Sequence, residues 1–349
     1  MQKTKINWAD SVWNPITGCS PISAGCERCY ARRMATRLHG RFGYPAKNPF
    51  RVTLHPDKLL QPLSTRKPRR IFISSMSDWM HPDVPDDYRD KMLAVMALTP
   101  WHTYYTLTKR ADNLLRYAAD PGMRSRVNDQ ICNWLFRVAS ADAMNAASEW
   151  EDTHYPETAG EGFAREWPRP NIILGVTAEN QEMLDLRVPL LLRLGALGWR
   201  TMVSAEPLLS AIDLTPWLES SRQEIRCLSA SGVGGHQGPS LGLIICGGET
   251  GPGARPVHPD WVRRIRDDCA AAGVLFHLKS LGEWVPSDEV PASQADTYSS
   301  KRRGSRQSCK VIDETLFVRV GTKAAGRVLD GKTHDARPNP KGAMNHDAR

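Results

Sequence analysis

Three cysteines lie close together near the start of the sequence, at positions 19, 26 and 29. Cys26 and Cys29 form a Cys-x2-Cys pair, and Cys19 precedes this pair by seven positions. Thiolates this close in sequence are typical ligands of zinc or of an iron–sulfur cluster. Three thiolates are one fewer than a closed tetrahedral site requires. The spacing therefore predicts a metal centre with a position left for a further ligand.

The cysteine cluster has three interpretations: a zinc site, an iron–sulfur cluster, or no metal. A zinc ribbon needs a second pair of cysteines or histidines at short spacing, and the remaining cysteines stand alone in the sequence. His39 and His55 could complete a zinc site, although neither falls in a recognised ligand pattern. Three thiolates can hold three irons of a 4Fe–4S cube and leave the fourth iron open, so the pattern favours an iron–sulfur cluster.

Polar or charged residues follow each of the predicted strands that are named below. For a single residue, a helix cap or a surface charge explains this equally well. The carboxyl ends of parallel strands converge on one face of a β/α fold, so the repeated pattern predicts a working site there. The candidates are Ser75, Asp78, Lys109, Glu179, Asn180, Glu206, Gly247, Gly248, Glu249 and Lys279.

A glycine-rich turn, GGETGPG at residues 247–253, follows one of these strands. Glycines let the backbone approach a ligand closely, so the turn could seat a nucleotide, a ribose or a carboxylate. It matches neither the dinucleotide-binding fingerprint nor the P-loop. A sharp loop before a helix remains the alternative.

The elements that must position these residues alternate between strands and helices. Short apolar, β-branched runs predict strands at 70–74, 103–107, 172–176, 201–203, 243–246 and 275–278. Helical patterns are found at 30–38, 86–98, 181–194 and 258–272. This alternation predicts parallel strands with right-handed crossovers, in an α/β fold of the partial (β/α) barrel type. A doubly wound open sheet is the second possibility.

Residues 1–285 are expected to form this barrel, with an insertion at about 120–170 that is helical around 128–150, and a flexible loop at about 220–240. A basic C-terminal extension is expected at 286–332, with a strand near 315–320 and a helix near 323–329. A disordered tail is expected at 333–349. The extension carries a basic cluster that is a candidate nucleic-acid contact or a solvated loop: Lys301, Arg302, Arg303, Arg306 and Lys310.

The net charge of +8 and a pI near 9.1 make a polyanionic partner possible, although a solvated basic surface would give the same numbers. The N-terminus lacks the apolar core of a signal peptide, and no apolar run approaches the roughly 18 residues of a membrane span. We therefore expect a cytoplasmic protein without a membrane partner, in which thiols stay reduced and clustered cysteines bind metal.

Several longer segments resemble a known family. They are NWADSVWNPITGC (7–19), GCERCYA (25–31), SMSDW (75–79), HPDVP (81–85), GVTAEN (175–180), EPLL (206–209), GGETGPGARP (247–256) and VGTKAAGR (320–327). Together they resemble the phage and prophage three-cysteine-motif proteins, a family long catalogued as a domain of unknown function and similar to radical S-adenosylmethionine (SAM) enzymes. The resemblance spans roughly residues 5–330.

The resemblance implies a 4Fe–4S cluster on Cys19, Cys26 and Cys29, with SAM bound to its open iron and cleaved to a 5′-deoxyadenosyl radical. It places Ser75 and Asp78 near the amino group or ribose of SAM. It also places Glu179, Asn180 and Glu206 toward ribose or substrate, and residues 247–249 toward adenine. Glu179, Glu206 and Lys279 are the catalytic candidates. The loop departs from the usual Cys-x3-Cys-x2-Cys pattern, because six residues separate Cys19 from Cys26.

The substrate implied by this resemblance and by the basic charge is phage DNA or a modified nucleotide. The specific expectation is an isomerisation of an amino-acid-decorated thymine, with flavodoxin or ferredoxin as reductant. In a phage-encoded protein the reaction would take place in the host cytoplasm. The alternatives are a zinc- or cluster-containing nucleic-acid-binding protein without catalysis, and a radical enzyme that modifies tRNA or a partner protein.

Overall fold

The structure is a computed structural model, and it describes residues 1–154, 167–218, 241–290 and 309–338. Its centre is a curled sheet of eight strands in the order β1-β2-β5-β6-β7-β8-β9-β10. The strands are β1 (Gln2–Lys3), β2 (Ser11–Trp13), β5 (Arg70–Ile73), β6 (Thr103–Tyr105), β7 (Ile172–Thr177), β8 (Arg200–Ala205), β9 (Leu243–Gly247) and β10 (Leu275–Ser280). From β2 to β10 each strand is parallel to the next, and β1 alone pairs antiparallel to β2.

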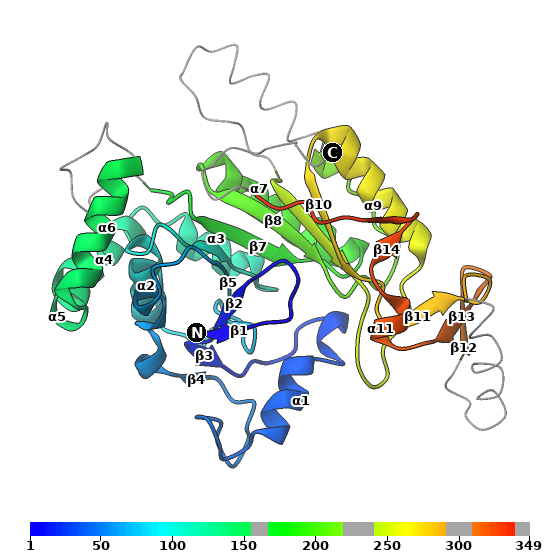
Figure 1. Ribbon diagram of the computed structural model, residues 1–349, viewed down its shortest axis with the longest axis horizontal. Helices are drawn as coiled ribbons and strands as arrows, with labels where there is room; N and C mark the ends of the chain where they lie inside the picture. Colours follow the sequence, from blue (N-terminus) through cyan, green and yellow to red (C-terminus); the bar gives the residue numbers. More distant parts are fainter. Residues whose placement is uncertain (155–166, 219–240, 291–308, 339–349) are drawn as a thin grey trace, which may run out of the picture.

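Helices cross between these strands and cover the outer face of the sheet (Figure 1). α2 (Asp86–Ala97) connects β5 to β6, α7 (Gln181–Ala196) connects β7 to β8, and α9 (Pro259–Ala272) connects β9 to β10. α3 (Ala111–Ala118) follows β6 and packs against α7. The strands follow one another across the sheet in chain order, whereas a doubly wound sheet reverses its order at a switch point. The predicted α/β class is confirmed, and the curled sheet is compatible with a partial barrel.

The helix ends follow from local sequence signals. Asn180 caps α7, because its side chain accepts a hydrogen bond from the Met183 amide at 2.9 Å. His258 caps α9 in the same way, with Pro259 at its first position. Gly273 ends α9 in the left-handed conformation, with φ of 70°.

The insertion between β6 and β7 is helical. It contains α4 (Met123–Asp129), a π-helical turn (Gln130–Leu135), α5 (Phe136–Val138) and α6 (Ala141–His154). The single helix predicted around 128–150 is interrupted because Ala139 adopts an extended conformation, with ψ of 151°.

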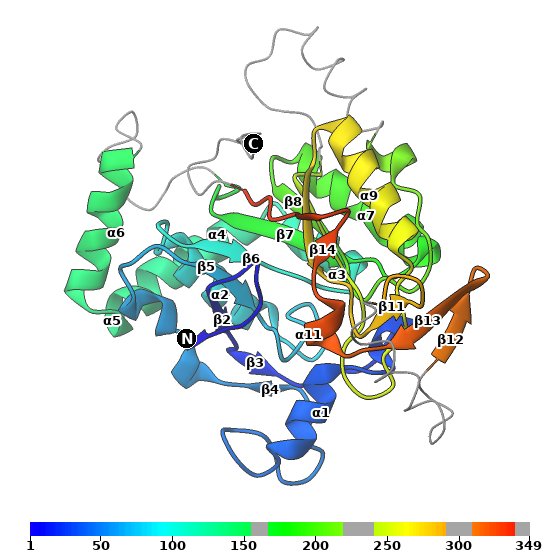
Figure 2. The ribbon, with the colours of Figure 1, turned by 45° about the vertical axis from the view of Figure 1, so that its right-hand side comes forward.

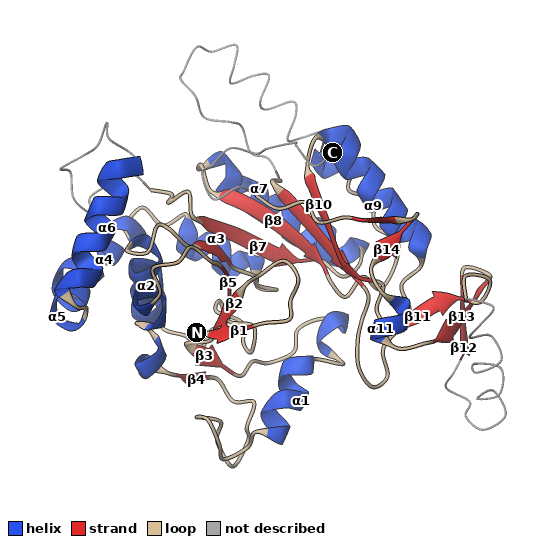
Figure 3. Cartoon of the chain, in the orientation of Figure 1, coloured by secondary structure: helices blue, strands red, loops and turns tan. Residues whose placement is uncertain are grey.

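A small C-terminal sheet lies beside the barrel, as Figures 2 and 3 show. It is antiparallel, with the order β11 (Trp284–Pro286), β13 (Thr315–Arg319) and β12 (Cys309–Ile312). The helix predicted at 323–329 is wrong beyond its first turn. α11 spans Thr322–Ala325, Gly326 then has φ of 65°, and β14 (Val328–Leu329) pairs with β15 (Lys332–Thr333).

The expected disorder does not begin at Thr333. The Leu278 amide donates to the carbonyl of His334 at 2.9 Å, and Asp335 forms an antiparallel bridge with His277. The chain therefore runs beside β10 and closes that edge of the sheet. The predicted loop at 220–240, the residues Lys301, Arg302, Arg303 and Arg306, and the end of the tail from 339 lie outside the described residues.

Candidate metal and cofactor site

The inner face of the curled sheet changes from apolar to polar along the strands. Side chains two residues apart share a face of a strand. On β8 the inner face therefore carries Met202 and Ser204 and continues to Glu206, and on β10 it carries Leu275 and ends with Lys279. Met202 and Leu275 belong to an apolar cluster that Trp8 joins from the N-terminal segment. This cluster fills the amino end of the half-barrel.

A cavity of about 460 Å³ lies over the carboxyl ends of the strands. Trp8 is part of its lining, so the cavity adjoins the apolar cluster. Its volume is within the range of pockets for small molecules and cofactors. Many of the predicted site residues line it: Cys19, Cys26, Cys29, Ser75, Asp78, Lys109, Glu206, Gly248, Glu249 and Lys279.

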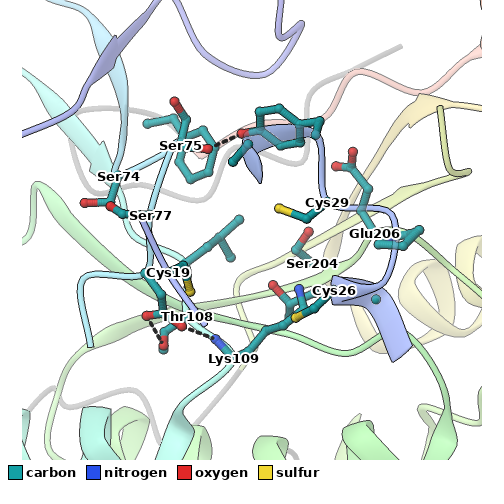
Figure 4. Close-up of a pocket in the computed structure, with 18 of the residues that line it drawn as sticks. Cys19, Cys26, Cys29, Ser74, Ser75, Ser77, Thr108, Lys109, Ser204 and Glu206 are labelled. Atoms are coloured by element: carbon teal, nitrogen blue, oxygen red, sulfur yellow. Dashed lines mark hydrogen bonds between the residues drawn. The ribbon is translucent and has the colours of Figure 1, made fainter. Parts of the chain in front are cut away.

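The three cysteines surround one part of this cavity, with Cys19 across from Cys26 and Cys29 (Figure 4). Burial, the largest cause, raises the pKa of the Cys19 thiol to about 11, and the nearby carboxylate of Asp78 adds to the rise. Within the described ranges, no three His, Cys, Asp or Glu side chains converge on a point that could hold one metal ion. The thiols thus share a cavity without forming a preassembled mononuclear site.

A single zinc ion and a multi-iron cluster require different spacings of these thiols. Zinc draws its thiolates to within about 3.8 Å of one another when each Zn–S bond is about 2.3 Å. In a cluster each thiolate binds a different iron, so the sulfurs stay further apart. His39 and His55 do not line the cavity. His39 contacts the carbonyl of Thr36, and His55 contacts the hydroxyl of Thr17, both at 2.8 Å.

Glu179 anchors the cysteine loop to the end of β7. It is fully buried, accepts hydrogen bonds from the Ser23 hydroxyl and from the Gly25 amide at 3.1 Å, and pairs with buried Arg187 at 2.8 Å. Burial alone would raise the pKa of Glu179, but Lys109, Ser23, Arg187 and the Gly25 amide together lower it below its usual value. Glu179 is therefore a charged positioning residue behind the loop, and it is not among the residues lining the cavity.

Asp78 joins the ends of β5 and β6 to the same loop. It accepts hydrogen bonds from the Thr108 hydroxyl at 2.6 Å and from the Lys109 amide at 3.2 Å, and it pairs with Arg110 at 2.8 Å. Arg110 in turn donates to the carbonyl of Ser20 at 3.0 Å and lies 3.6 Å from the Cys19 sulfur. Asp78 thus orients the cation that contacts the first cysteine.

Glu249 provides a third anchor, from the end of β9. Its carboxylate receives Arg255 at 2.7 Å and Arg28 at 3.4 Å, and Arg255 also donates to the carbonyl of Ala24 at 3.0 Å. Burial alone would raise the pKa of Glu249, but the hydrogen bonds and charge of Arg255, with Arg28, lower it. The loop is therefore fixed from three different strand ends.

Glu206, directly after β8, and Lys279, on β10, form an ion pair within the cavity lining. Both side chains remain partly exposed, at 19% and 28%. They differ in this from Asp78 and Glu249, which are almost covered. Glu206 and Lys279 are thus the charged pair best able to exchange partners with a ligand.

The remaining candidates are Asn180 and Gly247, which lie outside the cavity lining, and Gly248, which is part of it. Asn180 caps α7, and neither Asn180 nor Gly247 is among the lining residues. Gly248 lies so close to the turn after β10 that an added Cβ would meet the backbone of Leu281 at 2.8 Å. The roles toward SAM, ribose or adenine predicted for these residues stay predictions.

Sequence reasoning missed Ser74 as a site residue, because it lies inside the strand predicted at 70–74. Ser74 lines the cavity with φ of 54°, and its buried hydroxyl has no hydrogen-bond partner among the described residues. No local sequence signal identifies the positive φ of a serine.

Together, the fold and the site define a partial parallel β/α barrel with three cysteines at a cavity over its carboxyl-terminal face. The chain belongs to the family described as "Protein of unknown function (DUF5131)", whose model matches residues 3–338. The resemblance found in the sequence thus agrees with a family of unknown function.

One solved structure resembles this chain: "Spore photoproduct lyase complexed with dinucleoside spore photoproduct". The likeness has a TM-score of 0.36 and 9% sequence identity, and it covers 87% of this chain and 66% of the other. The likeness is too slight to carry a fold or a function. The chain spans just under two thirds of that protein's length.

The comparison with curated proteins gives no match. In the part of the chain that the structure describes, no helix is long and apolar enough to cross a membrane.

Proposed function

We propose that this protein is a radical SAM-like enzyme that uses a 4Fe–4S cluster held by Cys19, Cys26 and Cys29. The observation that carries the proposal is that these three thiols line one cavity at the carboxyl ends of consecutive parallel strands. Three cysteine ligands leave one iron of such a cluster for a ligand that is not protein. When bound, the cluster and SAM supply a 5′-deoxyadenosyl radical that removes a hydrogen atom from an unactivated carbon.

The residues of the chain divide into anchors and ligand contacts. Glu179, Asp78 and Glu249 are engaged by arginines and backbone amides, so we assign them to holding the cysteine loop. Ser75, which lines the cavity, offers a polar contact to a cofactor.

Glu206 and Lys279 are the charged groups we assign to the substrate. They present a carboxylate and an ammonium side by side in the cavity, and this suits a ligand part with both an amine and a carboxylate.

We infer that the substrate is phage DNA or a nucleotide carrying an amino-acid-decorated thymine, and that the reaction is an isomerisation. The net charge of +8 supports a polyanionic substrate. A rearrangement at an unactivated carbon requires the kind of hydrogen abstraction that radical chemistry supplies. We propose flavodoxin or ferredoxin as the reductant and the cytoplasm, the host's if the chain is phage-encoded, as the location.

The test uses anaerobically purified and reconstituted protein with SAM and dithionite. We expect 5′-deoxyadenosine by chromatography and mass spectrometry, and its loss in Cys29→Ala but not in Cys132→Ala, which changes an exposed cysteine outside the cavity lining. Intact SAM would contradict the proposed activity. With DNA that carries the modified thymine, digestion to nucleosides should reveal a product of unchanged mass and altered retention time, as an isomerisation requires.

A further inference from the structure

The segment directly after the cysteine loop is strongly basic and contains no acidic residue. Between Glu27 and Asp57 the sequence has seven cations and no aspartate or glutamate. We call residues 28–56 the basic arm. Its cations are Arg28, Arg32, Arg33, Arg37, Arg41, Lys47 and Arg51.

The basic arm contributes little to the core. Its helix, α1 (Tyr30–Arg37), buries only Ala31 and Ala35, and in both ribbon views the helix and the loop after it project from the body of the molecule (Figures 1 and 2). The arm closes with β4 (Thr53–Leu54), which pairs with β3 (Ile16–Thr17). Phe42, in the projecting loop, is 75% exposed.

The cations of the basic arm are mostly unneutralised. Arg28 pairs with Glu249, and none of the other six forms an ion pair with a residue that the structure describes. Arg33 donates to the carbonyls of Thr250 and Pro252, and Arg32 lies over the ring of Phe50 at 5.7 Å. Like charges gathered without acidic partners repel one another and do not stabilise a fold. The pattern therefore indicates an anionic partner.

The basic arm is fastened to the cavity at both ends. Tyr30, Ala31 and Phe50 line the cavity, and the Cys19 amide donates to the carbonyl of Phe50 at 3.0 Å. A polyanion bound along the arm would therefore pass beside the cavity that the three cysteines line. An eight-residue helix is about 12 Å long, and this distance spans on the order of three or four phosphates along one DNA strand.

We propose that the basic arm binds the phosphate backbone of a DNA strand and so presents one nucleotide of that strand to the cavity. This inference rests on the proposed function, and it deepens it by making the substrate a polymer and not a free nucleotide. In the sequence, the arm begins after Cys26 and is far from the basic cluster predicted at 301–310.

The test compares two triple variants of the reconstituted protein. Arg32→Gln/Arg37→Gln/Arg41→Gln removes three exposed cations of the basic arm. The control, Lys67→Gln/Arg137→Gln/Arg193→Gln, removes three exposed cations from segments outside the arm and the cavity lining. Binding of a fluorescent single-stranded 20-mer and of its duplex is measured by anisotropy over a range of salt concentrations.

We expect the arm variant to reduce the slope of log K against log salt by about 2 to 3, because each lost phosphate contact removes about 0.7 to 0.9. The control should leave the slope close to that of the unmodified protein, and unchanged thermal unfolding should show that both variants are folded. Equal losses in both variants would overturn the proposal. Competition by free thymidine monophosphate as effective as by the oligonucleotide would also overturn it.

Binding to phosphatidylserine vesicles tests whether the arm binds an anionic membrane surface and not DNA. Arm-dependent binding to vesicles without binding to DNA would refute the DNA assignment. SAM cleavage is measured in the same preparations, so the two proposals can fail separately. A protein that cleaves SAM but shows no arm-dependent DNA binding would contradict this inference and leave the radical activity standing.

Discussion

Replacing Glu179 by glutamine tests whether this buried carboxylate holds the cysteine loop. The change preserves the size of the side chain and removes its charge, and it leaves Arg187, whose side chain is 3% exposed, without its carboxylate partner. Breaking a buried pair in this way costs about 3 to 5 kcal/mol, and we expect the lower end because glutamine still accepts a hydrogen bond. The free energy of unfolding should therefore fall by about 3 kcal/mol.

This cost converts into a measurable change of melting temperature. The unfolding entropy is about 2.1 cal/mol/K per residue, or about 0.7 kcal/mol/K for the 349-residue chain, so Glu179→Gln should lower Tm by about 4 °C. Glu182→Gln is the matched control, because Glu182 is exposed in the first turn of α7 and contributes less than about 1 kcal/mol through the helix dipole.

Calorimetry of the metal-free proteins and iron analysis after reconstitution measure the two consequences of the substitution. We expect Glu179→Gln to melt lower and to retain less iron, because Ser23 and Gly25 lose a charged acceptor. A Tm within about 1 °C of the control, together with iron content equal to the unmodified protein, would refute the anchoring role.

Three further predictions concern pH, backbone packing and the exposed ion pair. The pKa of Glu179 is lowered in the folded protein, so the stabilisation from its charge is complete at pH values above its ordinary pKa of 4.5. This stabilisation is lost as the pH falls through the lower pKa of the folded state. The difference in Tm between the unmodified protein and Glu179→Gln should therefore shrink only in that acidic range. Gly248→Ala should destabilise the protein by about 1 to 3 kcal/mol, because the added Cβ would lie 2.8 Å from the backbone of Leu281. In the control Gly247→Ala the added Cβ would lie 3.4 Å from its nearest neighbour, so this variant should unfold at nearly the denaturant concentration of the unmodified protein. Glu206→Gln and Lys279→Met should each reduce turnover of the modified nucleotide while sparing cofactor cleavage without substrate, and equal losses of both rates would contradict a substrate-binding role.

Much of the fold could be predicted from the sequence, because the buried strands are short β-branched runs that alternate with helical segments. The prediction of 172–176 corresponds to β7, and the prediction of 86–98 corresponds to α2. β2 was missed, since its three residues carry too little pattern to be recognised, and their strand conformation comes from pairing with β5. The ordered segment after Thr333 was missed because backbone hydrogen bonds to β10 hold a polar sequence.

The candidate site could be predicted as a set of strand ends, but the division of labour within it could not. Glu179 and Glu206 both follow predicted strands, yet one is fully buried behind the cysteine loop and the other borders the cavity. The difference comes from the partners of Glu179. Arg187 follows Glu179 by 8 residues and Ser23 precedes it by 156, and the fold brings both to its carboxylate. Alternation along a strand indicates which face of the sheet a side chain lies on. It does not indicate which arginines pair with a carboxylate, because those pairs form in the tertiary structure.

The iron content of anaerobically reconstituted protein tests the central claim most directly. We predict about four irons and four sulfides per chain, with a visible charge-transfer band, and loss of both in Cys19→Ala, Cys26→Ala and Cys29→Ala but not in Cys132→Ala. Colourless protein with one zinc per chain would contradict the account, as would an iron content that survives replacement of any one of the three cavity cysteines.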